Sequence, residues 1–399
     1  MRLINIWTNK LESFTSEIPT YVILSHTWGT DSEEVTFQEM LVDPGDRPPS
    51  TTLKPGYRKI FRTCQNAQHY NLSNEASIYH QDRLLHQDQR IEHAWIDTCC
   101  IDKSSSAELS EAINSMYKYY LEAVVCFAYL SDMTANLGTF ETSRWFTRGW
   151  TLQELVAPRS IRFYDKSWAF RGTRHTFRDV IQRVTHISTF EYTSELPVAV
   201  RMSWASQRHT TRVEDLAYCL MGIFDVNMPL LYGEGKKAFI RLQEEIIKQN
   251  PDLSIFAWTN PLPSMFSGLL AESPQWFRDG HELEAAPSIR TVYSEFSVTN
   301  QGIRFREYPL KYYKPTGCLV LVLGHQSRSQ RMRLGLLLRQ ISKEFCVRVS
   351  PDRLLDEDEC SSSWEMTIQV PKVLSSREIL DTGRNTVTLS GGISGFIHQ

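Results

Sequence analysis

The first 165 residues contain short runs of consecutive apolar residues, each followed by polar or turn-forming residues. A continuous apolar run of roughly 4–8 residues is typical of a strand buried on both faces, as in a parallel sheet. Strands are therefore predicted at residues 21–25, 94–96, 124–130 and 160–164.

Helical patterns separate these runs. Between the second and third runs, apolar residues recur at helical spacing, namely Leu109, Ala112, Ile113, Met116 and Tyr120. Ser105 and Glu108 fit a capping box just before this helix. Another helix is predicted over residues 57–69. Strands alternating with helices indicate an α/β domain over residues 1–165, with a parallel sheet and helices on both faces.

The pattern changes after residue 165. Helices are predicted at 176–184, 212–224 and 236–250, so residues 166–252 are expected to form a helical extension that packs on the first domain. Alternating and continuous apolar positions then dominate, as at residues 303–306 and 318–323. Residues 253–399 are therefore predicted to be a β-rich module, in which we expect no catalytic group of residues.

Composition narrows the function classes. The 399 residues carry a net charge of -3, which gives no electrostatic case for a nucleic-acid partner. No run reaches the ~20 apolar residues of a membrane span, and the N-terminus lacks the apolar core of a signal peptide. The eight Cys include no C-x-x-C pair. We therefore expect a cytoplasmic protein with reduced thiols and no metal site.

Several tempting motifs do not carry chemistry. Residues 71–92 are polar and read as an exposed insertion, and the spacing of His80, His86 and His93 fits no single helical face. The sequence Gly-Glu-Gly-Lys at 233–236 is no P-loop, because Leu230 stands where that motif needs a glycine. The Gly-Gly-Ile-Ser-Gly stretch from Gly391 follows the last strand instead of preceding a helix, so it does not fit a nucleophile elbow.

Candidate chemistry gathers where the predicted strands end. His26 and Trp28 follow the first strand, and Asp97 follows the apolar part of the second. Ligands of open α/β sheets collect at such carboxyl ends. The alternatives are purely structural: His26 is solvated, Trp28 covers the core, and Asp97 caps a turn. The residues alone leave both interpretations open.

The stretch from Ser143 to Pro158 is the most unusual, because it contains two Trp, two Arg and one Glu. Glu154 falls between Leu152 and Leu155 at the edge of the apolar face of a short predicted helix. A carboxylate in that position either pairs with a base or does chemistry. Arg144 or Arg148 could supply the ion pair, with Trp145 and Trp150 as core residues.

Four ordered blocks closely resemble the fungal heterokaryon-incompatibility (HET) domain. They are Tyr21-Val-Ile-Leu-Ser-His-Thr-Trp-Gly, Ala94-Trp-Ile-Asp-Thr-Cys-Cys-Ile-Asp-Lys, Ser143-Arg-Trp-Phe-Thr-Arg-Gly-Trp-Thr-Leu-Gln-Glu-Leu, and a segment from Met202-Ser-Trp-Ala to Tyr232-Gly-Glu-Gly. The resemblance implies programmed cell death when genetically different fungal cells fuse, a role akin to innate immunity. The nucleotide-binding switch and repeats of some members are not expected here.

A more distant resemblance links the order of elements to Toll/interleukin-1-receptor (TIR) domains. It implies a TIR-like, flavodoxin-like fold. Trp150-Thr-Leu-Gln-Glu-Leu is similar to the TIR motif whose Glu is catalytic in NAD hydrolases, which transfers that role to Glu154. Ser25 matches the Ser that ends the first TIR strand. The loop after it departs, because residues 26–29 are one residue longer than the plant TIR pattern and lack its Arg.

These residues fit a reaction that has NAD as its substrate and needs no cofactor. Cleavage of the nicotinamide–ribose bond has an oxocarbenium-like transition state, which one carboxylate can stabilise. Trp28 or Trp150 would stack on a base, and Arg144 or Arg148 would meet the pyrophosphate. Ser25, His26 and Asp97 would complete the substrate site.

Two hypotheses remain open. The first is a cell-death effector that hydrolyses NAD through Glu154 when it self-associates. The second is a non-enzymatic signalling module that acts by self-association or by binding an incompatibility or receptor protein, with the C-terminal module as its sensor or restraint.

Overall fold

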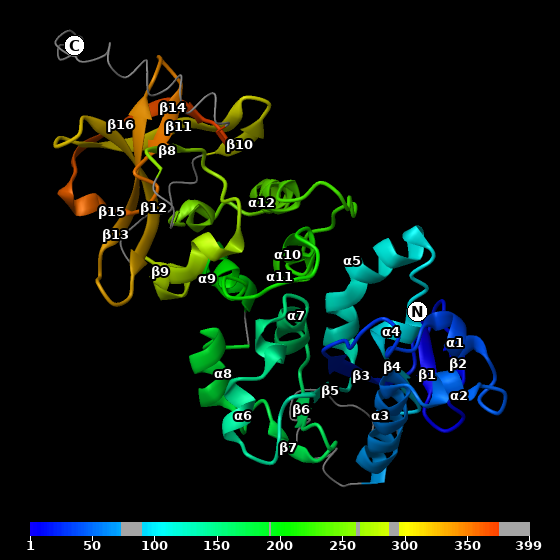
Figure 1. The fold of residues 1–399 in the computed structure, drawn as a ribbon. Coiled ribbons are helices and arrows are strands. Elements are labelled where there is room, and N and C mark those ends of the chain that lie inside the picture. Colours follow the sequence, from blue (N-terminus) through cyan, green and yellow to red (C-terminus); the bar gives the residue numbers. More distant parts are fainter. Residues whose placement is uncertain (73–89, 191–192, 261–263, 287–294, 375–399) are drawn as a thin grey trace. The chain divides into compact units, whose positions relative to one another are not determined.

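The computed structural model describes residues 1–72, 90–190, 193–260, 264–286 and 295–374. The chain forms two compact units (Figure 1). The first contains Met1–Phe190 and Arg208–Leu230, and the second contains Glu191–Gln207 and Leu231–Gln399. Most of the polar insertion predicted at 71–92, and the Gly391 stretch, lie outside the described residues.

A seven-stranded sheet forms the centre of the first unit, in the order β2-β1-β4-β3-β5-β6-β7. Its strands are β1 (Arg2–Asn5), β2 (Leu11–Ser13), β3 (Tyr21–His26), β4 (His93–Trp95), β5 (Val125–Tyr129), β6 (Ile161–Tyr164) and β7 (Phe170–Thr173). The four strands predicted from apolar runs are β3, β4, β5 and β6. They pair in parallel, and β3 is buried along its whole length.

The expectation of a purely parallel sheet is corrected at both edges. β1 pairs antiparallel with both β2 and β4, and β7 returns antiparallel to β6. The strands β1, β2 and β7 contain three or four residues each, with exposed or half-buried positions, and β2 and β7 form the two edges of the sheet. Because an edge strand is covered less completely, it needs no continuous apolar run, so the sequence pattern missed it.

Helices cover both faces of this sheet. In Figure 1, α3 lies on one side of it, and α5 and α7 lie on the other. Aromatic contacts agree, because Tyr70 of α3 packs on Phe127 of β5 while Tyr120 of α5 packs on Trp95 of β4. The helices of the first unit are α1 (Phe37–Leu41), α2 (Pro49–Thr52), α3 (Pro55–Leu72), α4 (Asp97–Cys100), α5 (Ser106–Glu122), α6 (Gly138–Glu141), η2 (Arg144–Thr147), α7 (Thr151–Val156), α8 (Arg178–Thr185), α10 (Asp215–Tyr218) and α11 (Met221–Phe224).

The strand order creates a crevice between β3 and β5. The chain runs from β3 to β4 on one side and then crosses to β5 on the other, so the connections diverge at this point. Ligands of open α/β sheets bind outside the carboxyl ends of strands at such a switch point. The loops that follow β3 and β5 meet here, because the hydroxyls of Thr27 and Ser131 are 3.2 Å apart.

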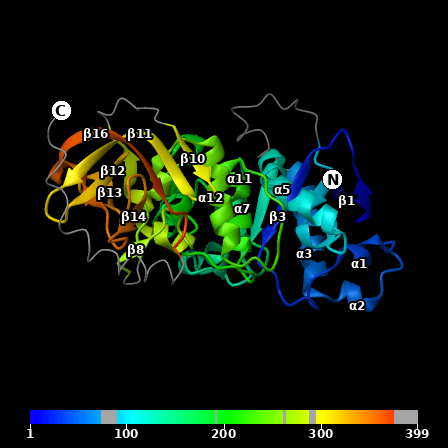
Figure 2. The same ribbon diagram turned by 90° about the horizontal axis from the view of Figure 1, so that it is seen from above.

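The second unit contains a β-rich sheet, as predicted for the C-terminal region. Figure 2 shows β11, β12 and β13 side by side within it. Its path is β10-β11-β12-β13-β14-β8, with β9, β15 and β16 pairing alongside. These strands are β8 (Phe266–Ser267), β9 (Leu283–Ala285), β10 (Phe296–Thr299), β11 (Gly302–Tyr313), β12 (Cys318–Ser327), β13 (Arg333–Gln340), β14 (Cys346–Val349), β15 (Leu355–Asp356) and β16 (Ser361–Val370).

Helical segments follow residue 165, but they divide between the units. The second unit contains α9 (Val198–Ser203), α12 (Lys237–Gln249), η3 (Thr193–Glu195), η4 (Leu253–Phe256), η5 (Pro274–Glu282) and η6 (Glu357–Glu359), whereas α8, α10 and α11 belong to the first. The two units therefore divide the chain differently from the predicted segments 1–165, 166–252 and 253–399, and those three domains remain a prediction. Within the described ranges, no helix is long and apolar enough to cross a membrane.

Candidate functional site

Glu154 lies on α7 and is 6% exposed. Its Oε2 accepts a 2.5 Å hydrogen bond from the hydroxyl of Ser25, at the end of β3. The same Ser25 oxygen accepts a 2.7 Å bond from the indole Nε1 of Trp145. Trp145 is fully buried against Phe163, so the indole is held in one place. The two hydrogen bonds, from Trp145 to Ser25 and from Ser25 to Glu154, therefore fix the side-chain carboxyl of Glu154 next to the C-terminal end of β3.

The protonation of Glu154 follows from this enclosure. Burial raises its pKa from 4.5 to about 8, and the nearby charge of Asp97 acts in the same direction. The hydrogen bond from Ser25 and the charge of Arg148 lower it, but they do not offset the burial. The free protein therefore holds Glu154 mostly protonated near neutral pH.

The ion-pair alternative for Glu154 is not found. In the described part of the chain, Glu154 forms no ion pair with Arg144 or Arg148. The Nε of Arg144 is instead 3.8 Å from Asp132, and its side chain is 72% exposed. Glu154 is also not an open-cleft carboxylate. It is a buried carboxyl that depends on a hydroxyl and an indole, an arrangement that neither sequence interpretation described.

His26 and Asp97 form a second polar group next to Ser25. The Nε2 of His26 is 3.5 Å from Asp97, and neither ring nitrogen of this buried side chain has a hydrogen-bond partner among the described residues. Burial lowers the pKa of His26, and the charges of Lys59, Arg148 and Lys103 lower it further. Burial raises the pKa of Asp97, against the effect of Lys103. His26 is therefore neutral near pH 7.

Trp28 connects this group to the surface. Its Nε1 donates a 2.9 Å bond to Asp97, and the ammonium of Lys103 lies 3.7 Å from the centre of its ring. With 37% of its surface exposed, Trp28 is not a core cover. Its edge is fixed and one face carries a cation, so the ring is held in a defined orientation.

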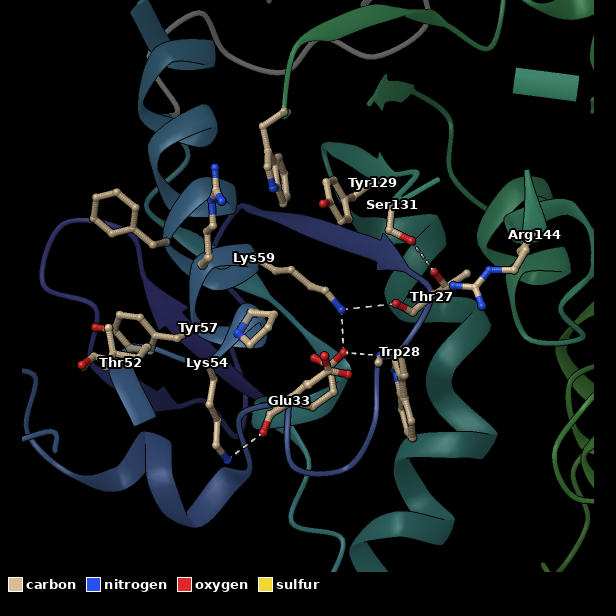
Figure 3. Close-up of a pocket in the computed structure, with 17 residues that line it drawn as sticks. Thr27, Trp28, Glu33, Thr52, Lys54, Tyr57, Lys59, Tyr129, Ser131 and Arg144 are labelled. Carbon is tan, nitrogen blue, oxygen red and sulfur yellow. Dashed lines mark hydrogen bonds and ion pairs between the residues drawn. The ribbon is translucent and has the colours of Figure 1, made fainter. Parts of the chain in front are cut away.

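A pocket of about 680 Å³ opens at the crevice between β3 and β5 (Figure 3). Trp28 and Arg144 line it, together with Thr27, Tyr129, Ser131 and the N-terminal part of α3. Six of the sequence-predicted residues do not line this pocket: Ser25, His26, Asp97, Arg148, Trp150 and Glu154. The predicted residues thus separate into a buried group around Glu154 and the wall of an adjacent pocket.

The remaining predicted residues support the helix that carries Glu154. Trp150 precedes α7 and is only half-buried, so it is not the core residue that one interpretation expected. The backbone oxygen of Arg148 accepts a bond from the hydroxyl of Thr151 and another from the guanidinium of Arg208. Arg148 therefore acts on Glu154 through its charge and through the start of α7.

Arg208 is a residue that sequence reasoning missed. It is 3% exposed and donates to Arg148 O at 2.8 Å and Thr151 Oγ1 at 3.0 Å. Burial lowers its pKa to about 10, and the charge of Glu154 opposes that shift. The signal was available, because Arg208 lies inside the fourth block of the HET resemblance. Tyr120 was predicted only as an apolar-face residue, although its hydroxyl also donates to Leu24 O at 3.1 Å.

Within the described ranges, no group of His, Cys, Asp and Glu side chains could hold a metal ion. The described cysteines are free thiols, and seven of them are buried.

Comparisons with known proteins include a family match that covers the first two of the four blocks. Residues 21–142 match the family model described as heterokaryon incompatibility protein (HET), and residues 237–268 match a domain of unknown function, DUF8212. Vegetative incompatibility protein HET-E-1 of Podospora anserina is 40% identical over 283 residues, which are 66% of this chain and 19% of that protein. No solved structure matches. The family match ends before Glu154 and includes Ser25, His26, Trp28 and Asp97.

Proposed function

Residues 21–142 of this chain form a heterokaryon incompatibility (HET) domain, and from this premise we propose that the chain acts in heterokaryon (vegetative) incompatibility. The name of the Podospora relative supports this role, although the chain spans only 19% of that protein. The outcome we propose is cell death of the fused cell, of the kind used in fungal innate immunity.

We further propose that the domain is TIR-like and hydrolyses NAD at the nicotinamide–ribose bond. The observation that supports this most is the state of Glu154, a buried carboxyl held by Ser25 and free of any ion pair in the described part of the chain. A carboxylate that only stabilises a fold is normally paired with a base. A carboxyl with a strongly raised pKa beside a strand-end crevice is characteristic of a functional site.

The reaction balances without a cofactor. The bond between ribose C1 and the nicotinamide nitrogen breaks, and its electron pair leaves with nicotinamide, which is thereby neutral. Water adds to C1 and releases a proton, so the products are nicotinamide, ADP-ribose and a proton. The ionised Glu154 stabilises the positive charge that develops on the ribose. The positive nicotinamide ring of the bound substrate favours this ionised form, because an opposite charge lowers the pKa of a carboxyl.

The remaining predicted residues support substrate binding. His26, which is neutral, and Asp97 offer polar atoms to ribose hydroxyls, and Trp28 offers an oriented ring for stacking. Arg144 is exposed and suited to a phosphate, whereas Arg148 and Trp150 support the helix of Glu154. Self-association would complete the site.

The test follows nicotinamide release from NAD by concentrated protein, with wild type beside Glu154→Ala. Release by the wild type that is lost in the variant supports hydrolysis. Absence of release at every concentration, together with equal toxicity of both proteins in cells, contradicts it.

The alternative is a non-enzymatic signalling module that binds a second copy or an incompatibility or receptor protein. Two apolar residues on the pocket side of the HET domain favour it, since Leu53 is 82% and Phe61 is 48% exposed. Larger exposed apolar patches mark interaction surfaces, and we propose that these two residues belong to one. Loss of toxicity in Leu53→Ser, together with no nicotinamide release by the wild type, would favour this alternative over hydrolysis.

A further inference from the structure

The pocket at the crevice between β3 and β5 has a chemistry of its own, separate from Glu154. Four basic side chains and two acidic ones line it: Lys54, Arg58, Lys59, Arg144, Glu33 and Glu34. This excess of positive charge faces a volume of about 680 Å³. The N-terminal turns of the 18-residue helix α3 form one wall and add the positive end of the helix dipole.

Two of the basic groups are already neutralised. The ammonium of Lys59 is 2.5 Å from Oε1 of Glu34 and 3.2 Å from Thr27 O (Figure 3). Lys54 pairs with Glu39 at 2.7 Å. Because both ammonium groups are paired with carboxylates, the charges of Lys54 and Lys59 are not available to a ligand.

The other two basic groups are available to a ligand. The guanidinium of Arg58 has no hydrogen bond or ion pair in the described part of the chain, and it lies on the exposed side of α3. Arg144 makes only a long, exposed contact of 3.8 Å with Asp132. Guanidinium groups bind phosphate oxygens through two parallel hydrogen bonds. Arg58 and Arg144 are therefore the side chains of this pocket that are suited to phosphate oxygens.

The side chain of Glu34 is a second feature of the pocket, besides its basic groups, that points to a ligand. Its side chain is buried and lines the pocket, and its Oε1 accepts from Gly29 N at 2.7 Å as well as from Lys59. Its Oε2 is also buried, yet it has no hydrogen-bond partner among the described residues. A buried unpaired carboxylate oxygen is costly, so this atom calls for a donor such as a ribose hydroxyl.

The pocket also has aromatic walls. Tyr129 and Trp168 are stacked with their ring centres 4.5 Å apart and their planes 14° from parallel, and both line the pocket. Trp28 and Phe61 line it as well. Flat aromatic walls beside phosphate-binding groups suit a nucleobase.

We propose that this pocket binds a purine nucleotide, with its phosphates on Arg58 and Arg144, a ribose hydroxyl on Glu34 Oε2 and its base against the aromatic walls. The assignment goes beyond the proposed hydrolysis and does not depend on it. One ligand chemistry has two sources here: the adenylate half of the dinucleotide substrate, and a separate nucleotide that regulates the protein.

The test is calorimetric titration of the full chain with ADP. Arg58→Ala and Arg144→Ala each remove one exposed phosphate-binding group, so each is expected to weaken ADP binding about tenfold or more. Arg62→Ala is the matched control, because Arg62 lies on the same helix outside the pocket and donates to Gln65. It is expected to bind ADP as the wild type does.

Other results would overturn the assignment. They are absence of saturable ADP binding by the wild type, equal ADP affinity in Arg58→Ala, adenosine binding as tightly as ADP, or inorganic phosphate binding as tightly as ADP. The last two would show that phosphate or base, respectively, contributes nothing.

Inhibition of nicotinamide release assigns the source. Competition between ADP and NAD supports the adenylate half of the substrate, and inhibition or activation without competition supports a regulatory nucleotide. If the protein binds ADP but releases no nicotinamide, the proposed hydrolysis is contradicted and the nucleotide-binding pocket is supported. If it releases nicotinamide but binds no ADP, the pocket assignment is contradicted and hydrolysis is supported.

Discussion

The hydroxyl of Ser25 donates a 2.5 Å hydrogen bond to Glu154, although the two residues are 129 positions apart in the chain. This bond joins the end of β3 to α7, and Trp145 completes it from the other side at 2.7 Å. A serine that accepts from an indole must direct its own proton elsewhere, and here it directs that proton at the carboxyl. The geometry therefore orients Glu154 without neutralising it by a base.

Replacing Ser25 by alanine tests this arrangement. Ser25→Ala leaves Trp145 Nε1 without its acceptor and Glu154 without its donor, both buried. We expect a loss of about 1–3 kcal/mol in the free energy of unfolding, measured by urea denaturation. Ser131→Ala is the control, since its hydroxyl makes only a 3.2 Å contact with Thr27, and a change within about 0.5 kcal/mol is expected. Equal losses in both variants would contradict the special position of Ser25.

The pH dependence of stability tests the protonation of Glu154. In the native protein burial raises its pKa to about 8, from 4.5. Between these values the native state keeps a proton that the unfolded chain releases. The contribution of Glu154 is therefore complete below about pH 4.5 and falls as pH rises toward 8, by about 1.4 kcal/mol per pH unit.

Glu154→Gln isolates this contribution, because the amide does not titrate. Urea denaturation across this pH range is expected to give a flatter profile for the variant than for the wild type. Parallel profiles would show that Glu154 is ionised in the native protein, contrary to its burial.

The close contact of Gly222 with Tyr117 allows the packing of α11 against α5 to be tested. A Cβ at Gly222 of α11 would overlap the side chain of Tyr117 on α5. Gly222→Ala is therefore expected to destabilise the protein by about 1–3 kcal/mol, through displacement of these helices. Gly45→Ala places its Cβ in open space and should change stability by less than about 0.5 kcal/mol. Thermal unfolding measures both, and a neutral Gly222→Ala would contradict the helix contact.

Local pattern predicted much of this fold, because buried parallel strands and an amphipathic helix leave strong signals. Ser105 is an example, since its side chain accepts from Glu108 N at the start of α5 as expected. The short strands β1, β2 and β7 left no such signal. The wider division into two units also depends on contacts between distant segments, which periodicity does not contain.

The candidate site was predictable in part for the same reason. The sequence placed Glu154 beside an apolar face and Trp28 at a strand end, where the structure has them. It could not reveal that Trp145 reaches Ser25 across 120 positions, or that Glu154 has no ion pair within the described ranges. Arg208 was missed because a buried Arg has no periodic signature, and the pocket residues of α3 were missed because a helix pattern does not show which side faces a crevice.

The central claim is that the carboxyl of Glu154 performs the chemistry of this chain. The most direct measurement is the cellular NAD level during an incompatibility reaction, compared between wild type, Glu154→Gln and the surface control Glu141→Gln. Glu141 forms only an exposed 3.4 Å pair with Arg183. NAD is expected to fall and cells to die with the wild type and with Glu141→Gln, whereas Glu154→Gln is expected to spare both at equal protein abundance. Cell death by Glu154→Gln equal to that of the wild type, with NAD unchanged, would contradict it.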